Sequence, residues 1–172
     1  AKDVKEEFGN KIKYILDGGA CAIGIESTII NLTNKPTILR LGSLDISKIR
    51  KTLGCKIDIN IKPRKKITSG QSHLHYSPGI PLRKNILKPK KDEAFILIKK
   101  KKTKLKNYFY ISTKNNLNEA AKNLYSCLRK IKNLGYKSIA VEKIPYKGIG
   151  KAINDRLERA SKFLVNHTYK RY

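Results

Sequence analysis

A stretch rich in proline and glycine, residues 62–90, divides this chain of 172 residues into two patterned parts. Neither strand alternation nor helical spacing runs through the stretch, because Pro and Gly interrupt it at positions 63, 70, 78, 79, 81 and 89. Long connections without regular structure are usually disordered or functional. We therefore expect a structured region over 1–61, a linker over 62–90 and a second structured region over 91–172.

The first region alternates short apolar runs with turns. Residues 23–32 predict a strand rich in β-branched side chains, and residues 37–40 follow an Asn-Lys-Pro turn as the expected hairpin partner. Residues 14–16 predict another short strand. Over 44–53 the apolar residues stand at helical spacing, with Asp45 as the expected N-cap and a glycine stop.

The second region returns to regular patterns, with a helix between strand candidates and short connections. Strand, helix, strand in this order is a βαβ unit, which implies a parallel sheet covered by helices. The expected fold class is therefore α/β. The predicted elements are strands over 95–98, 108–111 and 138–141, a helix over 117–134 and a last helix from about residue 150.

The charge balance leaves two interpretations open. A net charge of +26 would let the chain bind polyanions non-specifically. Lysine outnumbers arginine 31 to 8, however, and specific phosphate or base recognition favours arginine. Solvated lysine-rich surfaces are therefore the favoured interpretation. The alternative is a basic, non-enzymatic RNA- or ribosome-binding module, in which Tyr108, Phe109 and Tyr110 stack on bases rather than fill a core strand.

Composition also bears on the class of protein. No apolar run approaches the ~18–20 residues of a membrane span, and no signal peptide opens the chain. Three distant cysteines fit a reducing cytoplasm, and Cys21 and Cys127 have the small or apolar neighbours typical of buried cysteines. His73 and His75 lack partners at metal-ligand spacing, so we expect no metal site. A chain without methionine, starting at Ala1, suggests a segment of a longer protein.

Two features of the first region suggest a binding site. Glu26, Ser27 and Thr28 interrupt a strand otherwise built for burial, and a half-buried carboxylate needs partners. An edge strand with one solvated face is the alternative interpretation. Arg40 is the only arginine among the first 49 residues, and it ends the next predicted strand. Its planar donor fork suits a carboxylate or a phosphate.

One glycine pair in the second region also allows two interpretations. Gly148 and Gly150 precede the last predicted helix and could cradle a phosphate at its N-terminus. Two glycines lack the third glycine of a dinucleotide-binding fingerprint, so a tight loop leading into the helix is favoured.

Several motifs, in the right order, resemble the YrdC/Sua family of threonylcarbamoyl-AMP synthases, which act in the t6A modification of tRNA. The resemblance covers nearly the whole chain and is specifically to the C-terminal part of the long, two-domain subfamily. Leu41 and Ser69 stand where the family usually has proline, and its Lys/Arg-rich nucleotide motif and Ser-Ala-Asn stretch have no counterpart here. The matching motifs are Tyr14–Gly19, Gly24–Ile30, Ile38–Ser43, Gly70-Gln71, His75–Pro78, Asn116–Ala121, Gly148–Gly150 and Ala152–Leu157.

The resemblance implies a division of the chain. Residues 1–61 would be the C-terminal portion of a YrdC-like α/β catalytic domain. Residues 62–90 would be an interdomain linker and lid, and 91–172 a small Rossmann-like domain with a parallel sheet. A chain of this kind is expected to be incomplete as an enzyme on its own.

The resemblance also implies a chemistry. The family condenses L-threonine, bicarbonate and ATP into threonylcarbamoyl-AMP and pyrophosphate, with Mg²⁺ bound through the nucleotide and no tightly bound cofactor. By this resemblance, Ser27 would bind L-threonine, and Arg40, His75 and Tyr76 would bind ATP. No residue is assigned to catalysis. Expected partners are these substrates, other t6A-pathway proteins and RNA bound non-specifically, with no membrane, in the cytoplasm.

Overall fold

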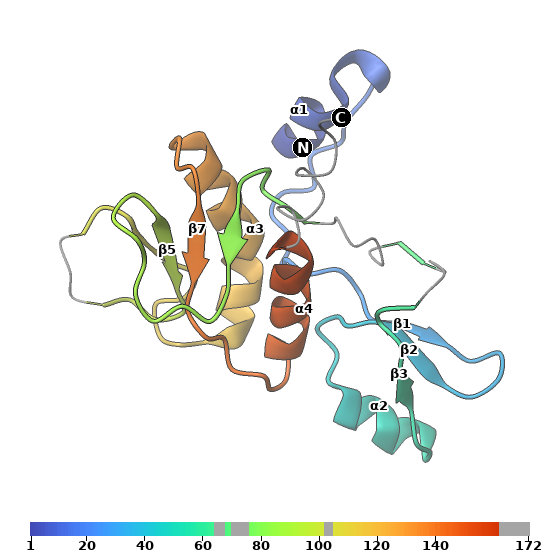
Figure 1. Cartoon of the computed structure of the whole chain (residues 1–172). Helices are drawn as coiled ribbons and strands as arrows, with labels where there is room; N and C mark the ends of the chain where they lie inside the picture. Colours follow the sequence, from blue (N-terminus) through green and yellow to red (C-terminus); the bar gives the residue numbers. More distant parts are fainter. Residues whose placement is uncertain (64–67, 70–75, 102–104, 162–172) are drawn as a thin grey trace, which may run out of the picture.

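The computed structural model of the chain describes residues 1–63, 68–69, 76–101 and 105–161. Its strands form two sheets, one of three strands beside helix α2 and one of four strands beside helices α3 and α4 (Figure 1). A short helix, α1 (Lys2–Phe8), continues into a 3₁₀ turn, η1 (Gly9–Lys11), at the top of the view.

The smaller sheet contains the predicted hairpin. Strands β1 (Ile29–Asn31) and β2 (Thr37–Arg40) pair antiparallel, and β3 (Asp58–Ile59) pairs parallel to β2. A parallel pair needs a crossover connection, which helix α2 (Ile46–Leu53) provides between β2 and β3. The sheet therefore places the carboxyl end of β2 next to the turn that leads into α2.

Both predicted ends of α2 are confirmed. The Asp45 carboxylate accepts a hydrogen bond from the Ser47 N–H at 2.8 Å, as an N-cap does. Gly54 ends the helix at φ 65°, in the left-handed region that glycine adopts without strain. Ile46 and Ile49 are the buried side chains of the helix and anchor it to the core.

The larger sheet confirms the βαβ unit and the α/β class. Its strand order is β4-β7-β5-β6, and every neighbouring pair is parallel. Helix α3 connects β6 to β7, and helix α4 follows β7. The elements are β4 (Leu82–Arg83), β5 (Ala94–Leu97), β6 (Tyr108–Tyr110), α3 (Leu117–Asn133), β7 (Ile139–Val141) and α4 (Gly150–Ser161).

One hydrophobic core joins the two sheets. Alternate side chains of β5 face opposite ways, so Ala94 and Ile96 enter the main core with α3 and α4, whereas Phe95 and Leu97 enter a small second cluster. The main core also takes in side chains of the smaller sheet and α2, including Ile38. The two regions therefore pack as one body.

Three local predictions are wrong. Residues 14–16 form no strand, and only Ile29–Asn31 of the strand expected over 23–32 belongs to a sheet. Gly24 explains part of this difference, because its φ of 72° does not fit a strand. In its described part, the stretch 62–90 also contains a short strand, β4, which pairs with β7 in the larger sheet. The division of the chain into three parts stays a prediction, but the part over 62–90 contributes β4 to the larger sheet.

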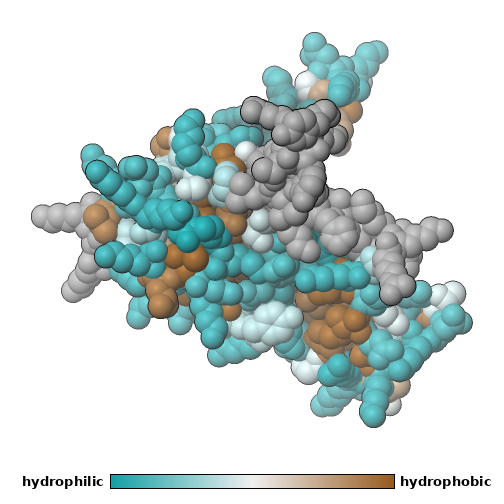
Figure 2. Space-filling view, in the orientation of Figure 1, coloured by the Kyte–Doolittle hydropathy of each residue, from teal (hydrophilic) through white to brown (hydrophobic). Residues whose placement is uncertain are grey.

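Exposed apolar side chains concentrate in the first region. Among the described residues, fourteen large hydrophobic side chains are exposed and ten of them precede residue 62; Tyr14 and Leu16 are 84% and 96% exposed. Figure 2 shows hydrophobic surface over the smaller sheet, at the lower right. Apolar surface of this kind often marks a contact with further polypeptide. Within the residues described, no helix is both long and apolar enough to cross a bilayer.

Candidate functional site

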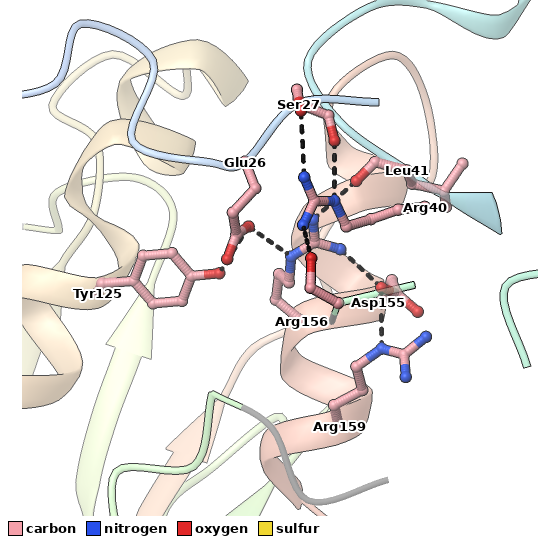
Figure 3. A network of polar contacts seen from close by, with 9 residues as sticks. Glu26, Ser27, Arg40, Leu41, Tyr125, Asp155, Arg156 and Arg159 are labelled. Carbon is pink, nitrogen blue, oxygen red and sulfur yellow. Dashed lines mark hydrogen bonds and ion pairs between the residues drawn. The ribbon is translucent and has the colours of Figure 1, made fainter. Parts of the chain in front are cut away.

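Arg40 and Ser27 meet at the carboxyl end of β2. The Arg40 guanidinium donates from Nε to the Ser27 carbonyl oxygen at 2.9 Å and from Nη2 to the Ser27 hydroxyl at 3.1 Å (Figure 3). Its Nη1 donates to the Ser69 hydroxyl in the linker at 3.2 Å. A guanidinium carries five N–H donors, so these contacts within the described chain use three of them. The donor fork predicted for Arg40 thus ties Ser27 to the linker.

The backbone around Ser27 lies unusually close to two neighbouring segments. A Cβ on Gly42 would lie 2.2 Å from the Thr28 nitrogen and 2.5 Å from the Ser27 carbonyl carbon. A Cβ on Gly24 would lie 2.5 Å from the Cα of Lys122 in α3. Such approaches are possible only because both residues are glycine. The two glycines therefore let the 24–28 loop pack between the end of β2 and helix α3.

Glu26, next to Ser27, has the partners that a half-buried carboxylate needs. It accepts hydrogen bonds from Arg156 Nε at 3.0 Å and from the Tyr125 hydroxyl at 3.4 Å. Burial pushes the pKa of Glu26 upward, but a backbone hydrogen bond and the Arg156 guanidinium outweigh it and hold the pKa below its ordinary value. Glu26 is therefore ionised at neutral pH. The prediction that this carboxylate is partnered is confirmed.

Arg156, on helix α4, is the centre of this network. Its side chain is 1% exposed, and besides Glu26 it donates from Nη1 to Asp155 at 2.7 Å and from Nη2 to the Leu41 carbonyl oxygen at 2.8 Å. Arg159 donates to the same Asp155 carboxylate at 3.2 Å and to the Ile61 carbonyl oxygen at 2.6 Å. A buried charge is tolerated only when it is paired and hydrogen-bonded, as these are.

Arg156 and Arg159 were not predicted as site residues from the sequence. Both stand beside the apolar stripe of α4, where a charged residue normally reads as part of a solvated face. A usable signal was present, because arginine is scarce in this lysine-rich chain. The scarcity of arginine, which drew attention to Arg40, marks these two arginines equally.

Tyr76 joins the linker to the same network. Its ring stacks on Tyr125, with centroids 5.6 Å apart, and the Arg156 guanidinium lies 5.0 Å from its centroid. Burial, chiefly, raises the pKa of Tyr76 to about 12, so its hydroxyl stays protonated at neutral pH. Its φ of 67° is rare for a residue other than glycine and is kept by the surrounding contacts. Of the four predicted site residues, Ser27, Arg40 and Tyr76 are thus linked, while His75 lies outside the described residues.

A pocket of about 510 Å³ lies next to Glu26. Linker residues form one wall and helix α3 another, and helix α1 contributes a carboxylate. The lining combines ring faces with charges of both signs, which suits a polar ligand with an apolar part. The lining residues are Glu7, Glu26, Tyr76, Ser77, Pro78, Tyr125, Leu128 and Arg129.

The structure also shows where the cysteine and glycine candidates from the sequence lie. Cys127 is buried, and burial raises the pKa of its thiol to about 11, so it is no nucleophile at neutral pH. Cys21, in contrast, is exposed, so the expectation that it is buried is wrong. A Cβ on Gly150 would lie 2.1 Å from the Pro145 carbonyl oxygen, which favours the tight loop over a phosphate cradle.

The aromatic strand β6 packs mainly inward. Phe109 is 9% exposed and meets Tyr136 edge to face, and Tyr108 meets Phe95 in the same way. These contacts favour the core-strand interpretation over a platform for stacking bases. Within the described part of the chain, no group of three His, Cys, Asp or Glu side chains could hold a metal ion.

Comparisons with known proteins agree with this architecture. The family model described as threonylcarbamoyl-AMP synthase, C-terminal domain, matches residues 44–162, and the Sua5/YciO/YrdC model described as telomere recombination matches residues 1–42. Relatives named threonylcarbamoyl-AMP synthase come from Pyrococcus abyssi (30% identical over 96% of this chain), Schizosaccharomyces pombe (27%, 94%) and Bacillus subtilis (27%, 94%). The match covers 54%, 48% and 52% of these relatives, so the chain spans about half their length.

Solved structures give the same result. The crystal structure of P. abyssi Sua5 complexed with L-threonine superposes with a TM-score of 0.80 at 29% identity, over 95% of this chain and 53% of that one. A variant of that protein, with an adjacent histidine and tyrosine replaced by alanine, superposes with a TM-score of 0.67 at 27% identity, over 92% of this chain and 49% of that one. Because the C-terminal-domain model alone matches more than half of the residues, this chain belongs to the threonylcarbamoyl-AMP synthase, C-terminal domain, family.

Proposed function

We propose that this chain supplies the second half of a threonylcarbamoyl-AMP synthase, which condenses L-threonine, bicarbonate and ATP for the t6A modification of tRNA. The reaction is an adenylyl transfer. L-Threonine and bicarbonate combine to N-carboxythreonine with loss of water. A carbamate oxygen of this compound then forms a bond to the α-phosphorus of ATP, and the bond from that phosphorus to pyrophosphate breaks. Such a reaction asks the protein mainly to position the reactants and to stabilise phosphate charge.

The meeting of Arg40 and Ser27 is the observation that carries this proposal. Three segments converge there: the end of β2, the 24–28 loop and the linker, through Arg40, Ser27 and Ser69. Ligands of open α/β sheets commonly bind where loops follow the carboxyl ends of strands. The two hydroxyls and the carbonyl that hold Arg40 are uncharged, so these three partners leave its positive charge unbalanced.

The contacts suggest a role for each side chain. The Ser27 hydroxyl accepts a hydrogen bond from Arg40, which leaves its own O–H to donate to the carboxylate of L-threonine. The N–H donors of Arg40 that point away from Ser27 and Ser69 would bind the phosphates of ATP. This arrangement would bring the two reactants together at one guanidinium.

The linker would act as a lid over this site. Ser69 and Tyr76 both contact the site network, one through Arg40 and the other through Tyr125 and Arg156. In P. abyssi Sua5 an adjacent histidine and tyrosine were replaced by alanine, and this chain has such a pair in His75 and Tyr76. A closed lid would exclude water, which hydrolyses a mixed anhydride such as threonylcarbamoyl-AMP.

The remaining requirements follow from the substrates. Mg²⁺ would enter with ATP and be held by its phosphate oxygens. ATP is then a substrate, and no tightly bound cofactor is needed. Other t6A-pathway proteins would take up the product, and the cytoplasm would supply ATP, L-threonine and bicarbonate. The net charge of +26 would add weak, salt-sensitive binding of RNA.

The proposal is tested by ligand binding to the assembled enzyme, meaning this chain together with the half that the relatives contain in addition. Calorimetry should detect L-threonine and ATP binding, and Arg40→Ala should weaken ATP binding. Arg50→Ala is the matched control, because Arg50 lies on α2 and contacts the Ile57 carbonyl oxygen rather than the site. Salt-sensitive RNA binding without any L-threonine or ATP binding would instead favour the RNA-binding alternative.

A further inference from the structure

Arg156 contacts the segments around the residues predicted to bind substrate. It binds Glu26, which precedes Ser27, and the carbonyl oxygen of Leu41, which follows Arg40. Its guanidinium also lies against the ring of Tyr76, which follows His75. These three segments are far apart in the sequence, and one buried side chain of helix α4 connects them. Figure 3 shows its contacts with Glu26 and Leu41.

We infer that Arg156 is a positioning residue of the substrate site, and that the C-terminal domain serves the reaction by setting this site's geometry through helix α4. The inference rests on the proposed function for its substrates, but the contacts themselves do not depend on it. Arg156 lies against Tyr76 itself, but its hydrogen bonds within the described chain go to Glu26, Asp155 and Leu41 rather than to the Ser27 or Arg40 side chains. It acts by holding the peptides on which Ser27 and Arg40 stand.

The chemistry of the side chain suits this role. The planar guanidinium donates to Glu26, Asp155 and Leu41 from three different nitrogens, so the rigid group fixes the positions of the three acceptors relative to one another. A lysine ammonium at this position would keep the charge but could not span the same three acceptors. Replacing Arg156 by lysine should therefore disrupt the network even though the positive charge is kept.

The surrounding charges keep Arg156 in place. Two carboxylates, Glu26 and Asp155, balance the two guanidinium groups of Arg156 and Arg159. Arg159 also binds the Ile61 carbonyl oxygen, just before the linker begins. Helix α4 is thus fastened to the 24–28 loop, to the end of β2 and to the start of the linker. Displacement of α4 would change the distances among all three.

A merely structural role is the competing explanation, and a matched control separates the two. Arg156→Lys removes the donor fork at the site. Arg83→Lys removes a comparable fork elsewhere, because Arg83 donates from Nε at 3.0 Å to Glu93, whose side chain is 1% exposed. Both variants disturb an arginine–carboxylate pair near the larger sheet, but only Arg156 contacts the segments around Ser27 and Arg40. Glu26→Gln is the second test variant, since it keeps the shape of the acceptor and removes its charge.

The experiment measures hydrogen exchange and steady-state kinetics of the assembled enzyme, below the melting temperature of every variant. In Arg156→Lys, backbone amides over 24–28 and 39–43 should lose protection while those of β5 and β7 keep it. The KM for L-threonine and for ATP should rise, and kcat/KM should fall by about a hundredfold, as a misplacement of about 1 Å can cause. Glu26→Gln should shift the same quantities in the same direction. Arg83→Lys should leave them unchanged.

Two results would overturn the inference. One is unchanged protection over 24–28 and 39–43 in both Arg156→Lys and Glu26→Gln. The other is a lowered melting temperature with wild-type KM values, which is the signature of a structural role alone. If the wild-type assembled enzyme instead shows no threonine-dependent activity, the proposed function fails, and the exchange measurement still decides whether Arg156 positions the two segments.

Discussion

Replacing Gly42 by alanine should damage the site directly, because the backbone of the 24–28 loop occupies the space where the new Cβ would lie. The Cβ would be 2.2 Å from the Thr28 nitrogen, about 1.2 Å closer than the 3.4 Å at which ordinary contact begins. The obstacle is backbone, so no flexible side chain can move aside. Over-packing of this kind costs about 1–3 kcal/mol in the free energy of unfolding. At about 2 kcal/mol, the melting temperature of a domain of this size falls by roughly 4–8 °C.

The assay compares Gly42→Ala with Gly18→Ala in thermal unfolding and in L-threonine binding. Gly18 is the matched control because nothing lies within 4 Å of its Cβ position and its φ is ordinary. We expect Gly18→Ala to behave as wild type. In Gly42→Ala the 24–28 loop must move by about an ångström, so Ser27 leaves Arg40 and threonine affinity falls by about a hundredfold. Wild-type stability and affinity in Gly42→Ala would refute the close packing of this loop on β2.

Three further predictions concern other contacts of the chain. Arg40→Ala should lower kcat/KM of the assembled enzyme by about ten- to a hundredfold, and Arg40→Lys by less, because lysine keeps the charge but not the planar guanidinium. Wild-type kinetics in both variants would remove Arg40 from the site. Asp45→Ala should cost about 1 kcal/mol in urea unfolding, because it removes the N-cap of α2, and no measurable loss would contradict that role. The folded-state pKa of Glu26 lies below its ordinary value of 4.5, so its stabilising contribution is present above pH 4.5 and is lost as the pH falls through the lowered pKa. The free energy of unfolding should therefore depend less on pH in Glu26→Gln than in wild type. The same pH dependence of unfolding in both proteins would speak against the ion pair.

The elements that the sequence predicted correctly are those with a sustained local pattern. Helix α3 keeps an apolar stripe along its length, and its ends carry Asn116 as N-cap and a glycine just after the helix. The hairpin of β1 and β2 is set by a turn between two β-branched runs. In these places local propensity and tertiary packing favour the same structure, so the pattern suffices.

The elements that the sequence missed depend on contacts between distant residues. Residues 23–28 have the composition of a strand, but close packing of Gly24 on α3 and of Gly42 on the loop keeps them out of the sheet. Strand β4 has only two residues, which is too short for any periodicity. Burial of Arg156 needs acceptors from the loop, from β2 and from its own helix, and a periodic pattern along α4 cannot show them. Ser27 and Arg40 were singled out separately because each was exceptional in its own segment, and the structure brings the two into contact.

The most direct test of the central claim is the release of pyrophosphate by the assembled enzyme, followed together with the formation of threonylcarbamoyl-AMP. Wild-type protein and Arg40→Ala are measured side by side, with L-threonine, bicarbonate and ATP present and with each omitted in turn. The account predicts pyrophosphate release that needs all three substrates and falls by about ten- to a hundredfold in Arg40→Ala. Pyrophosphate release that is independent of L-threonine, or that is unchanged in Arg40→Ala, would contradict it.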